Sequence, residues 1–287
     1  MAERLTDLVR AELAEPVDPR VSAMAAAIAA HYPGSARAVL FYGSCLRQSA
    51  LDGLMLDFYL IVSDYRDAYD GLWLKVANTL IPPNVFPFAH DGLVAKYAVL
   101  SEEDFARLNG PEAGDVSVWA RFAQPSRLVW SADDAAREAA IAAVARAAPT
   151  LLSYAAPMTD GGDPLEIWRR GFALTYASEL RAERRGRSES IVDTEPERYL
   201  RFGAAATVMP APRAEAAWGR FRRRGKMLSL VRLAKAATTF AGGADYLAWK
   251  INRHAGTQIE VRPWQRRWPI LGALILLPRL FLRGAIR

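Results

Sequence analysis

The sequence predicts an α+β fold, in which a mixed sheet with its helices is followed by a mainly helical part. Three apolar runs, at 37–42, 54–62 and 93–100, have the length and composition of buried strands. Helical patterns alternate with these runs over the first 150 residues, which is typical of a mixed sheet covered by helices. A Gly/Asp/Pro loop at 159–164 then precedes a stretch in which helical patterns dominate.

The expected helices begin at capping residues and end at glycine or proline. Ser101 and Ser131 are each followed by acidic residues, which is the arrangement of a helix N-terminus. Proline cannot continue a helix, so a helix near 66–80 should end at Ile81-Pro-Pro-Asn84. The full set comprises two helices over 1–30, one near 66–80, a short one after Ser101, one from Ser131 to about 148, one from Leu165 to about Arg185 closed by Gly186, and one over Tyr246–His254, with 203–217 as a connection.

The composition is that of a chain with a sizeable core. Of the 287 residues, 52% are hydrophobic, which allows one large or two small domains. We expect a first domain over 1–155 and a helical second domain over 156–287, with a basic amphipathic tail at about 262–287. Cys45 is the single cysteine, so an internal disulfide framework and a cysteine-rich zinc site are excluded. No histidine lies near Cys45 in sequence, so we expect a small thiol packed in a turn rather than a nucleophile.

Positive charge is concentrated in the C-terminal quarter of the chain. Residues 213–287 carry 16 Lys and Arg against three acids, a net charge of +13, whereas residues 1–212 carry a net charge of −7. A basic stretch on an acidic body predicts an anionic partner, for which nucleic acid and anionic lipid are the candidates. The stretch has no evident base-reading motif, so lipid fits better and no nucleic-acid partner is expected.

The same quarter has features of a lipid-binding surface. The apolar run at 270–277 is too short to span a bilayer, and aromatic and cationic residues flank it, as in segments that lie in the headgroup region. Alternatively, this run packs on the helical domain or against a second copy, with the basic cluster solvated. Because residues 1–10 do not form a signal peptide, we expect a peripheral protein on the cytoplasmic face of the cell membrane. The expected lipid-contacting residues are Arg222, Arg223, Arg224, Lys226, Trp264, Arg266, Arg267 and Trp268.

The most informative pattern lies between Ala38 and Val62. A Gly43-Ser44 turn follows one apolar run, and the next run carries one carboxylate, Asp57. A buried Asp needs a cation or hydrogen-bond donors, and a Gly-Ser turn offers backbone N–H groups and a hydroxyl that suit phosphate. Phosphate on the turn and a metal ion on the strand Asp is the arrangement of a nucleotidyl-transfer site. The pattern fits equally a glycine turn beside a strand Asp that is hydrogen-bonded within a core.

One position departs from the usual two-metal pattern. In the nucleotidyltransferase superfamily the strand presents Asp-x-Asp to two Mg²⁺ ions, and the second position here is Tyr59. A phenol cannot replace a magnesium-binding carboxylate at pH 7. Asp52 and Asp64 could supply the missing carboxylate, but both also fit as ordinary loop acids.

Four segments resemble those of one protein family. Three of them match its motifs in order and spacing: Phe41-Tyr-Gly-Ser44, Met55-Leu-Asp-Phe58 with Ile61-Val62, and Ala95-Lys-Tyr-Ala-Val-Leu-Ser101. The fourth, Tyr176-Ala-Ser-Glu179-Leu-Arg181 followed by Ser190-Ile-Val192, matches less closely. The segments resemble the mitochondrial-type phosphatidate cytidylyltransferases (CDP-diacylglycerol synthases, the translocator assembly and maintenance protein family), over roughly residues 38–200. The chain resembles a divergent bacterial-type member, with Cys45 where the family has glycine and Glu179 where it has Asp; the family's strand also lacks the second Asp.

The resemblance implies a polymerase-β-like nucleotidyltransferase fold and a specific reaction. CMP would pass from CTP to phosphatidic acid, giving CDP-diacylglycerol and pyrophosphate at an anionic membrane surface. Gly43 and Ser44 would bind the CTP phosphates, Asp57 would hold Mg²⁺, and Lys96 would contact phosphate. Glu179 and Arg181 would complete the site. A homodimer is compatible with the sequence.

From the residues alone, other interpretations stay open. Lys96 could also be a lysine whose stem covers an apolar strand while its ammonium group reaches solvent. Two further functions compete with the implied reaction. One is a nucleotidyltransferase that acts on another small molecule or on RNA. The other is a non-catalytic, nucleotide-dependent membrane-binding protein, favoured if Tyr59 and Cys45 disable metal or phosphate binding.

Overall fold

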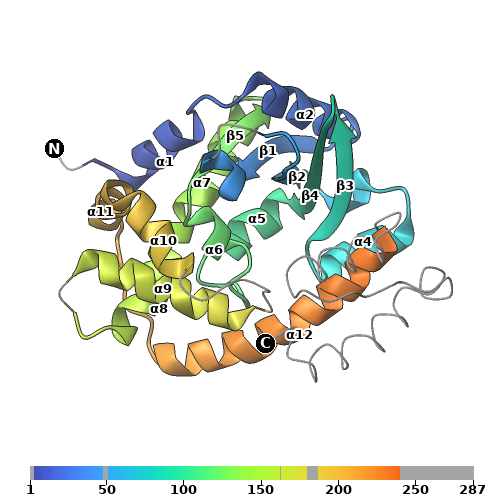
Figure 1. The fold of residues 1–287 in the computed structure, drawn as a ribbon. Helices are drawn as coiled ribbons and strands as arrows, with labels where there is room; N and C mark the ends of the chain where they lie inside the picture. The colour runs from blue at the N-terminus through green and yellow to red at the C-terminus, as the bar shows by residue number, and fades with distance from the viewer. Residues whose placement is uncertain (1–2, 48–50, 162, 180–186, 240–287) are drawn as a thin grey trace.

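A five-stranded mixed sheet forms the centre of the molecule (Figure 1). The computed structural model describes residues 3–47, 51–161, 163–179 and 187–239. The strand order is β3-β4-β2-β1-β5, in which β2 and β4 run parallel and the other neighbours run antiparallel. The strands are β1 (Ala36–Tyr42), β2 (Met55–Val62), β3 (Asn84–His90), β4 (Leu93–Ser101) and β5 (Ser126–Ser131).

Helices surround this sheet and then form a helical part of their own. Those that accompany the sheet are α1 (Leu5–Leu13), α2 (Pro19–Ala30), α3 (Tyr65–Ala68), α4 (Leu72–Leu80), α5 (Glu102–Asn109), α6 (Trp119–Phe122), α7 (Asp134–Ala145) and α8 (Ala147–Ala155). Those that follow are α9 (Pro164–Ser178), α10 (Arg187–Thr194), α11 (Pro196–Ala205) and α12 (Ala214–Thr239). Two short 3-10 helices, η1 (Ser44–Arg47) and η2 (Ala156–Met158), complete the set. The predicted α+β architecture, with a mixed sheet followed by a mainly helical part, is confirmed.

The two faces of the sheet pack against different helices. Because side chains alternate along a strand, Leu56, Phe58 and Leu60 of β2 point to the face that α2 covers. Tyr59 and Ile61 point to the opposite face, where they join the core formed with α5 to α8. This second core also includes Trp168, Phe172, Tyr199 and Trp218, so α9, α11 and α12 pack into the same apolar interior as the sheet.

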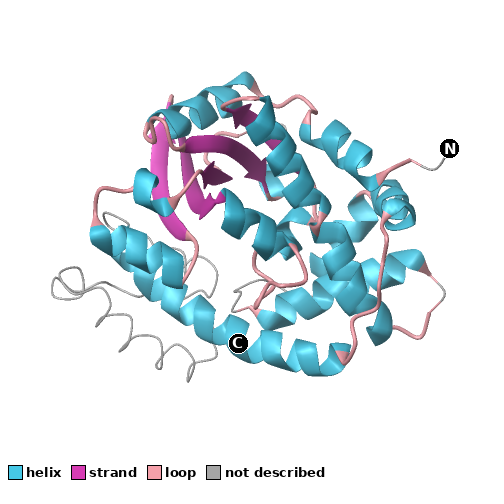
Figure 2. Ribbon diagram, turned by 180° about the vertical axis from the view of Figure 1, so that it is seen from behind, coloured by secondary structure: helices cyan, strands magenta, loops and turns pink. Residues whose placement is uncertain are grey.

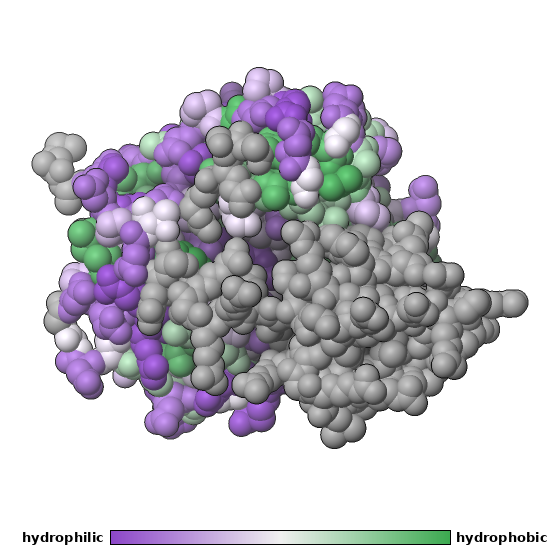
Figure 3. Space-filling model, in the orientation of Figure 1, coloured by the Kyte–Doolittle hydropathy of each residue, from purple (hydrophilic) through white to green (hydrophobic). Residues whose placement is uncertain are grey.

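The longest apolar helical stretch belongs to this interior. Among the described residues, Asp134–Met158 has the length and hydropathy that a bilayer-crossing helix needs, and 56% of its most apolar window is buried inside the protein. Figure 2, seen from behind, shows helices on several sides of the sheet. In the view of Figure 3, hydrophilic side chains cover most of the described surface, and hydrophobic ones gather in the upper part, where Figure 1 has the sheet. The apolar stretch therefore has a sufficient explanation as part of the core.

Most predicted elements occur, and two strands were missed. The runs at 37–42, 54–62 and 93–100 are β1, β2 and β4. The helix expected near 66–80 is two helices, α3 and α4, and it ends at Leu80 as predicted, before Pro82. The unpredicted β3 and β5 are the two edge strands of the sheet. Edge strands are buried less completely than central ones, so their sequences show a weaker apolar signal.

Three predicted helix boundaries are wrong. Ser131 ends β5, and the Asp133 carboxylate instead accepts a hydrogen bond from the Ala136 N–H at 2.7 Å and caps α7. The helix from Leu165 ends at Ser178 rather than near Arg185. At Ser178, α12 crosses so closely that a Cβ at Gly225 would overlap the Ser178 carbonyl. The connection expected over 203–217 is shorter, because α11 extends to Ala205 and α12 begins at Ala214. The helix predicted over Tyr246–His254 lies outside the described residues.

Candidate active site

A polar row crosses the sheet at the end of its otherwise apolar face. In the strand register, Tyr42 of β1 pairs with Asp57 of β2, and Asp57 pairs with Lys96 of β4. Registered residues on neighbouring strands point to the same face, so these three side chains lie side by side. Along β2, the position two residues further on this face is Tyr59, which belongs to the apolar core. The row therefore lies where the core face opens toward solvent.

Asp57 and Lys96 form an ion pair with unused capacity. The Lys96 ammonium lies 3.1 Å from Asp57 Oδ1, and the two side chains keep 24% and 29% of their surface accessible. Asp57 Oδ1 is itself buried, and the Lys96 ammonium that faces it is not aligned as a hydrogen-bond donor. An ion pair without an aligned hydrogen bond is weaker than one with it. Because both side chains also keep accessible surface, the pair can exchange its contact for one with a ligand.

The Gly43 turn brings backbone close to this carboxylate. Gly43 has φ +95°, a conformation that side-chain-bearing residues rarely adopt, and a Cβ placed there would lie 3.4 Å from Asp57 Oδ2. Ser44 then begins η1, and the Leu46 N–H closes the turn on the Gly43 carbonyl at 3.2 Å. The turn and the strand carboxylate that the sequence paired are thus neighbours in space.

Cys45 has the packing role expected of it. Its thiol is buried and donates to the Met55 carbonyl at 3.6 Å. Burial raises the pKa of the Cys45 thiol, and the Asp57 carboxylate adds to that increase. A thiol with a raised pKa is a poor nucleophile at neutral pH.

Tyr59, at the position where a second metal-binding carboxylate would stand, is part of the packed core. Tyr59 is buried, and its ring packs 5.2 Å from the rings of both Tyr42 and Phe122. Burial raises the pKa of Tyr59, so its phenol stays protonated. Neither alternative acid fills the gap: Asp52 is exposed and pairs with Arg20 at 3.2 Å, and Asp64 caps α3 through the Arg66 N–H. Both are the ordinary loop acids that the sequence allowed.

A cation that the sequence analysis did not single out lies beside this row. Arg121, on the short helix α6, pairs with Glu179 Oε1 at 3.3 Å and donates to the Ser117 carbonyl. Burial lowers the pKa of Arg121, but Glu179 and the phenols of Tyr59 and Tyr42 outweigh that effect, so its pKa lies above the ordinary value. Burial raises the pKa of Tyr42, Asp57 adds to the increase and Arg121 opposes it, so both charges act on this phenol of the polar row.

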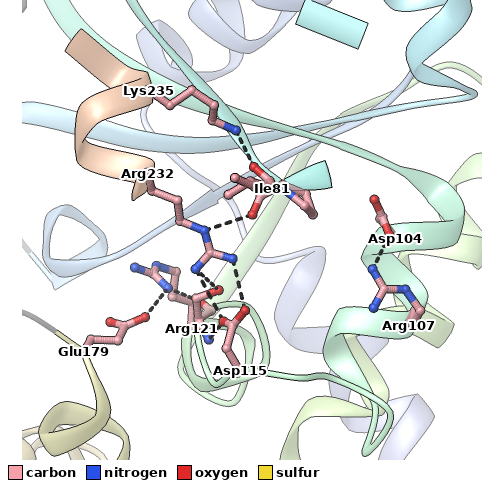
Figure 4. A network of polar contacts seen from close by, with 10 residues as sticks. Ile81, Asp104, Arg107, Asp115, Arg121, Glu179, Arg232 and Lys235 are labelled. Carbon is pink, nitrogen blue, oxygen red and sulfur yellow. Dashed lines mark hydrogen bonds and ion pairs between the residues drawn. The ribbon is translucent and has the colours of Figure 1, made fainter. Parts of the chain in front are cut away.

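The signal for Arg121 was present in the sequence. Arg121 stands in the apolar segment Val116–Ala123, where a charged side chain needs a partner for the same reason as Asp57. The partner, Glu179, was predicted as a site residue, but on a continuing helix. It instead follows α9 in an extended conformation, with its carboxylate directed to Arg121 (Figure 4).

A second ion pair adjoins the first (Figure 4). Arg232 of α12 donates to Asp115 Oδ2 at 3.1 Å, to the Ser117 hydroxyl at 3.1 Å and to the Pro82 carbonyl at 3.0 Å. Burial raises the pKa of Asp115, but Arg232 and the Ser117 hydrogen bonds reverse this, so its pKa lies below the ordinary value. Ser117 accepts from both arginines, through its carbonyl and its hydroxyl. Helix α12 is thereby tied to the loop that positions Arg121.

The residues present fit a magnesium ion that is held partly by substrate. Asp57 offers one partly accessible carboxylate, and the missing side chain of Gly43 leaves space beside its Oδ2. Within the described part of the chain, no group of three or more His, Cys, Asp or Glu side chains could hold a metal ion alone. Mg²⁺ commonly binds through one or two carboxylates together with substrate phosphates, so this donor set is compatible with it only when a nucleotide is bound.

The residues predicted for the site and for lipid contact fall into three groups. Arg181 and the group Trp264, Arg266, Arg267 and Trp268 lie outside the described residues. Arg222, Arg223, Arg224 and Lys226 are exposed on α12. The structure brings together Gly43, Ser44, Asp57 and Lys96, and it pairs Glu179 with Arg121, whose charge acts on Tyr42 of the same row.

Comparison with known proteins adds little to this geometry. No family model and no curated protein matches the sequence. Among solved structures, the chain is similar to the crystal structure of a nucleotidyltransferase-like protein from Exiguobacterium sibiricum 255-15, over 92% of this chain and 91% of that one, with 12% identity and a TM-score of 0.30. A likeness at this level carries no argument about function, which is therefore argued from the site.

Proposed function

We propose that this protein is a nucleotidyltransferase that transfers CMP from CTP to phosphatidic acid, giving CDP-diacylglycerol and pyrophosphate. One observation carries the proposal: the partly accessible Asp57–Lys96 pair lies against the Gly43 turn, where a Cβ would meet Asp57 Oδ2. A glycine turn, a strand carboxylate and a lysine in one row suit the binding of a triphosphate and a metal ion. The choice of CTP and phosphatidic acid rests on the sequence resemblance.

In this proposal the protein acts by positioning its substrates. The Gly43-Ser44 backbone and hydroxyl bind the CTP phosphates, and Lys96 turns from Asp57 toward them. A phosphate oxygen of phosphatidic acid forms a bond to the α-phosphorus of CTP, and the bond from that phosphorus to the bridging oxygen breaks, so the electron pair leaves with pyrophosphate. Such a transfer depends chiefly on alignment and on neutralising negative charge, and no covalent enzyme intermediate is needed.

Asp57, together with the triphosphate, would hold Mg²⁺, which when bound would neutralise charge on the phosphates. Arg121 is a further cation available to the anionic substrates. Its guanidinium is held by Glu179 and Ser117, yet 27% of its side-chain surface stays accessible. Glu179 then acts as a positioning residue that orients Arg121.

The direct test is incorporation of label into lipid. Purified protein is incubated with radiolabelled CTP, Mg²⁺ and phosphatidic acid in mixed micelles, with ATP, GTP and UTP in parallel. We expect labelled CDP-diacylglycerol from CTP, and its loss in Asp57→Asn. Asp52→Asn is the matched control, because Asp52 is an exposed acid five residues away with only a surface ion pair. Equal loss in both variants would contradict the assigned role of Asp57.

Other outcomes point to the alternatives. Pyrophosphate release from a nucleotide with RNA or a small molecule, but not with phosphatidic acid, would indicate a different acceptor. Nucleotide binding without any pyrophosphate release would favour the non-catalytic membrane-binding protein, for which the buried Tyr59 at the second carboxylate position is the supporting observation.

A further inference from the structure

Helix α4 presents its large apolar side chains to solvent. Leu72, Trp73 and Leu80 are 75%, 59% and 72% exposed, and Val76 is exposed as well. At about 100° per residue, these four positions lie within an arc of about 100° on one side of the helix. The buried side of α4 carries Ala77 and Asn78 instead. The more apolar side of α4 therefore faces solvent and its smaller and polar residues face the protein, which indicates an interaction surface rather than a core contact.

This surface continues onto α12. Lys235 donates to the carbonyls of Ala77 and Ile81, so α12 passes the C-terminal end of α4, and the two helices adjoin in both Figure 1 and Figure 2. Met227 and Val231, which lie two turns and one turn before Lys235, are also exposed. They follow one stripe of α12 that leads to the end of α4.

The charge of this stripe favours an anionic partner. Arg223 lies one turn before Met227, and Arg220 about one turn before Arg223, both exposed and on the same side of the helix. Between Ala216 and Thr239 the sequence of α12 contains no acidic residue. Asp67 and Asp70 are exposed just before α4, so the acidic side chains lie at the opposite end of the apolar face from the α12 cations.

We infer that the exposed apolar residues of α4 and the adjoining cationic stripe of α12 dock the protein on a bilayer that contains anionic lipid. Large apolar side chains beside Arg and Lys suit the headgroup region, where the apolar groups enter the acyl boundary and the cations meet lipid phosphates. The inference deepens the proposed function, since a lipid substrate requires such a surface, and it identifies a docking face separate from the predicted C-terminal tail.

Vesicle flotation of the full chain tests this inference. The vesicles are phosphatidylcholine alone or phosphatidylcholine with phosphatidylserine, without nucleotide. We expect wild type to float with the mixed vesicles and less with phosphatidylcholine alone, and high salt to weaken the binding. Trp73→Ser with Leu80→Ser should lower the partition coefficient about tenfold or more, because the two apolar side chains that would enter the bilayer are lost. The matched control, Leu200→Ser with Met209→Ser, removes exposed apolar residues elsewhere and should bind as wild type does.

Three results would overturn the inference. Wild type that does not float, or an α4 variant that floats as well as wild type, removes the docking role. A shift from dimer to monomer in light scattering in the α4 variant, with unchanged flotation, would instead assign this face to a second copy of the chain.

Failure here and failure of the proposed reaction are distinguishable. Turnover is measured separately on soluble short-chain phosphatidic acid below its critical micelle concentration, where docking is not needed. The α4 variant should keep wild-type turnover in that assay, because none of its substitutions touches the polar row of Asp57 and Lys96. Turnover without flotation would overturn only the docking inference, and flotation without turnover would overturn only the proposed reaction.

Discussion

Two carboxylate–cation pairs in this protein have opposite designs. Glu12 and Arg198 are each 9% exposed, and Arg198 reaches both Glu12 oxygens, the Ala123 carbonyl and the face of Phe202. Asp57 and Lys96 meet at 3.1 Å between the ammonium group and Oδ1, without an aligned hydrogen bond, and keep about three times as much surface accessible. A pair whose guanidinium nitrogens and carboxylate oxygens all have partners holds elements together, whereas a pair that keeps about a quarter of its surface accessible can exchange its contact for a ligand.

The surroundings of the two pairs support this distinction. A cavity of about 440 Å³ lies beside Glu12 and Arg198, between α1 and α11, and its lining includes none of the candidate site residues. Its inner cations already have partners, since Arg198 pairs with Glu12 and Arg127 pairs with Glu15. The size of a cavity is therefore a poorer guide to chemistry here than the state of its polar groups.

The largest expected effect comes from neutralising the available carboxylate. Asp57→Asn should lower kcat at least about 10³-fold, or about 4 kcal/mol, because the site loses its only strand carboxylate for a metal ion. The fold should persist, since Lys96 is partly solvated and needs no replacement partner. Labelled-lipid turnover and a urea unfolding curve measure the two quantities. Turnover near that of wild type would remove Asp57 from the chemistry.

Breaking the buried Glu12–Arg198 pair should lower stability rather than turnover. Arg198→Met leaves Glu12 buried without its cation, and we expect the free energy of unfolding to fall by about 3 to 5 kcal/mol. Turnover per folded molecule should change little. Arg201→Met is the control, because the Arg201–Glu3 pair is exposed and should contribute less than about 1 kcal/mol. Equal destabilisation by the two variants would show that burial does not separate these pairs.

A buried lysine, Lys235, extends the comparison to the pH dependence of stability. Burial lowers the pKa of Lys235 to about 7, and nearby Arg232 adds to the decrease. In the unfolded chain Lys235 binds its proton up to about pH 10.4, so between pH 7 and 10 the unfolded state binds more protons and stability rises with pH. Below pH 7 both states are protonated, and the full cost of burying the charge is present.

Lys235→Met should abolish this dependence. The variant should be more stable than wild type at pH 6, and the difference should shrink by up to about 1.4 kcal/mol per pH unit above pH 7. Urea unfolding of both proteins from pH 6 to 9.5 gives the difference directly, and effects of other titrating groups cancel. A difference that stays constant with pH would show that Lys235 does not change its protonation in this range.

The sequence predicted the central strands and the Asp57–Gly43 pairing because each has a local signal. An apolar run with one carboxylate, and a glycine at a turn, can be identified without knowing their neighbours. The Arg121–Glu179 pair could not be predicted in this way, because its partners are 58 residues apart and Glu179 takes its position only after α9 ends. At that end α12 crosses α9 at Gly225, a tertiary contact that no local pattern of the sequence predicts.

Arg121 combines features of both pairs, because its guanidinium contacts Glu179 and Ser117 while 27% of its side-chain surface stays accessible. Arg121→Lys keeps the charge but loses the planar guanidinium, so we expect the KM for CTP to rise about tenfold with kcat within about threefold. Steady-state kinetics at fixed lipid gives both constants, and Arg66→Lys, an exposed residue of α3, is the control. A fall in kcat at unchanged KM would place Arg121 at the reacting phosphate instead of at substrate binding.

The smallest effect is expected at the position where a second carboxylate is absent. Tyr59→Phe removes one hydroxyl and keeps the ring that packs on Tyr42 and Phe122. Because burial raises the pKa of Tyr59, its phenol carries no charge at pH 7 and cannot act as an anionic metal ligand, so kcat and KM should stay within about twofold of wild type. A loss of tenfold or more in Mg²⁺-dependent turnover, with unchanged stability in urea, would instead show that the hydroxyl takes part in the site. In that case the buried face next to Asp57 would belong to the chemistry rather than to the core.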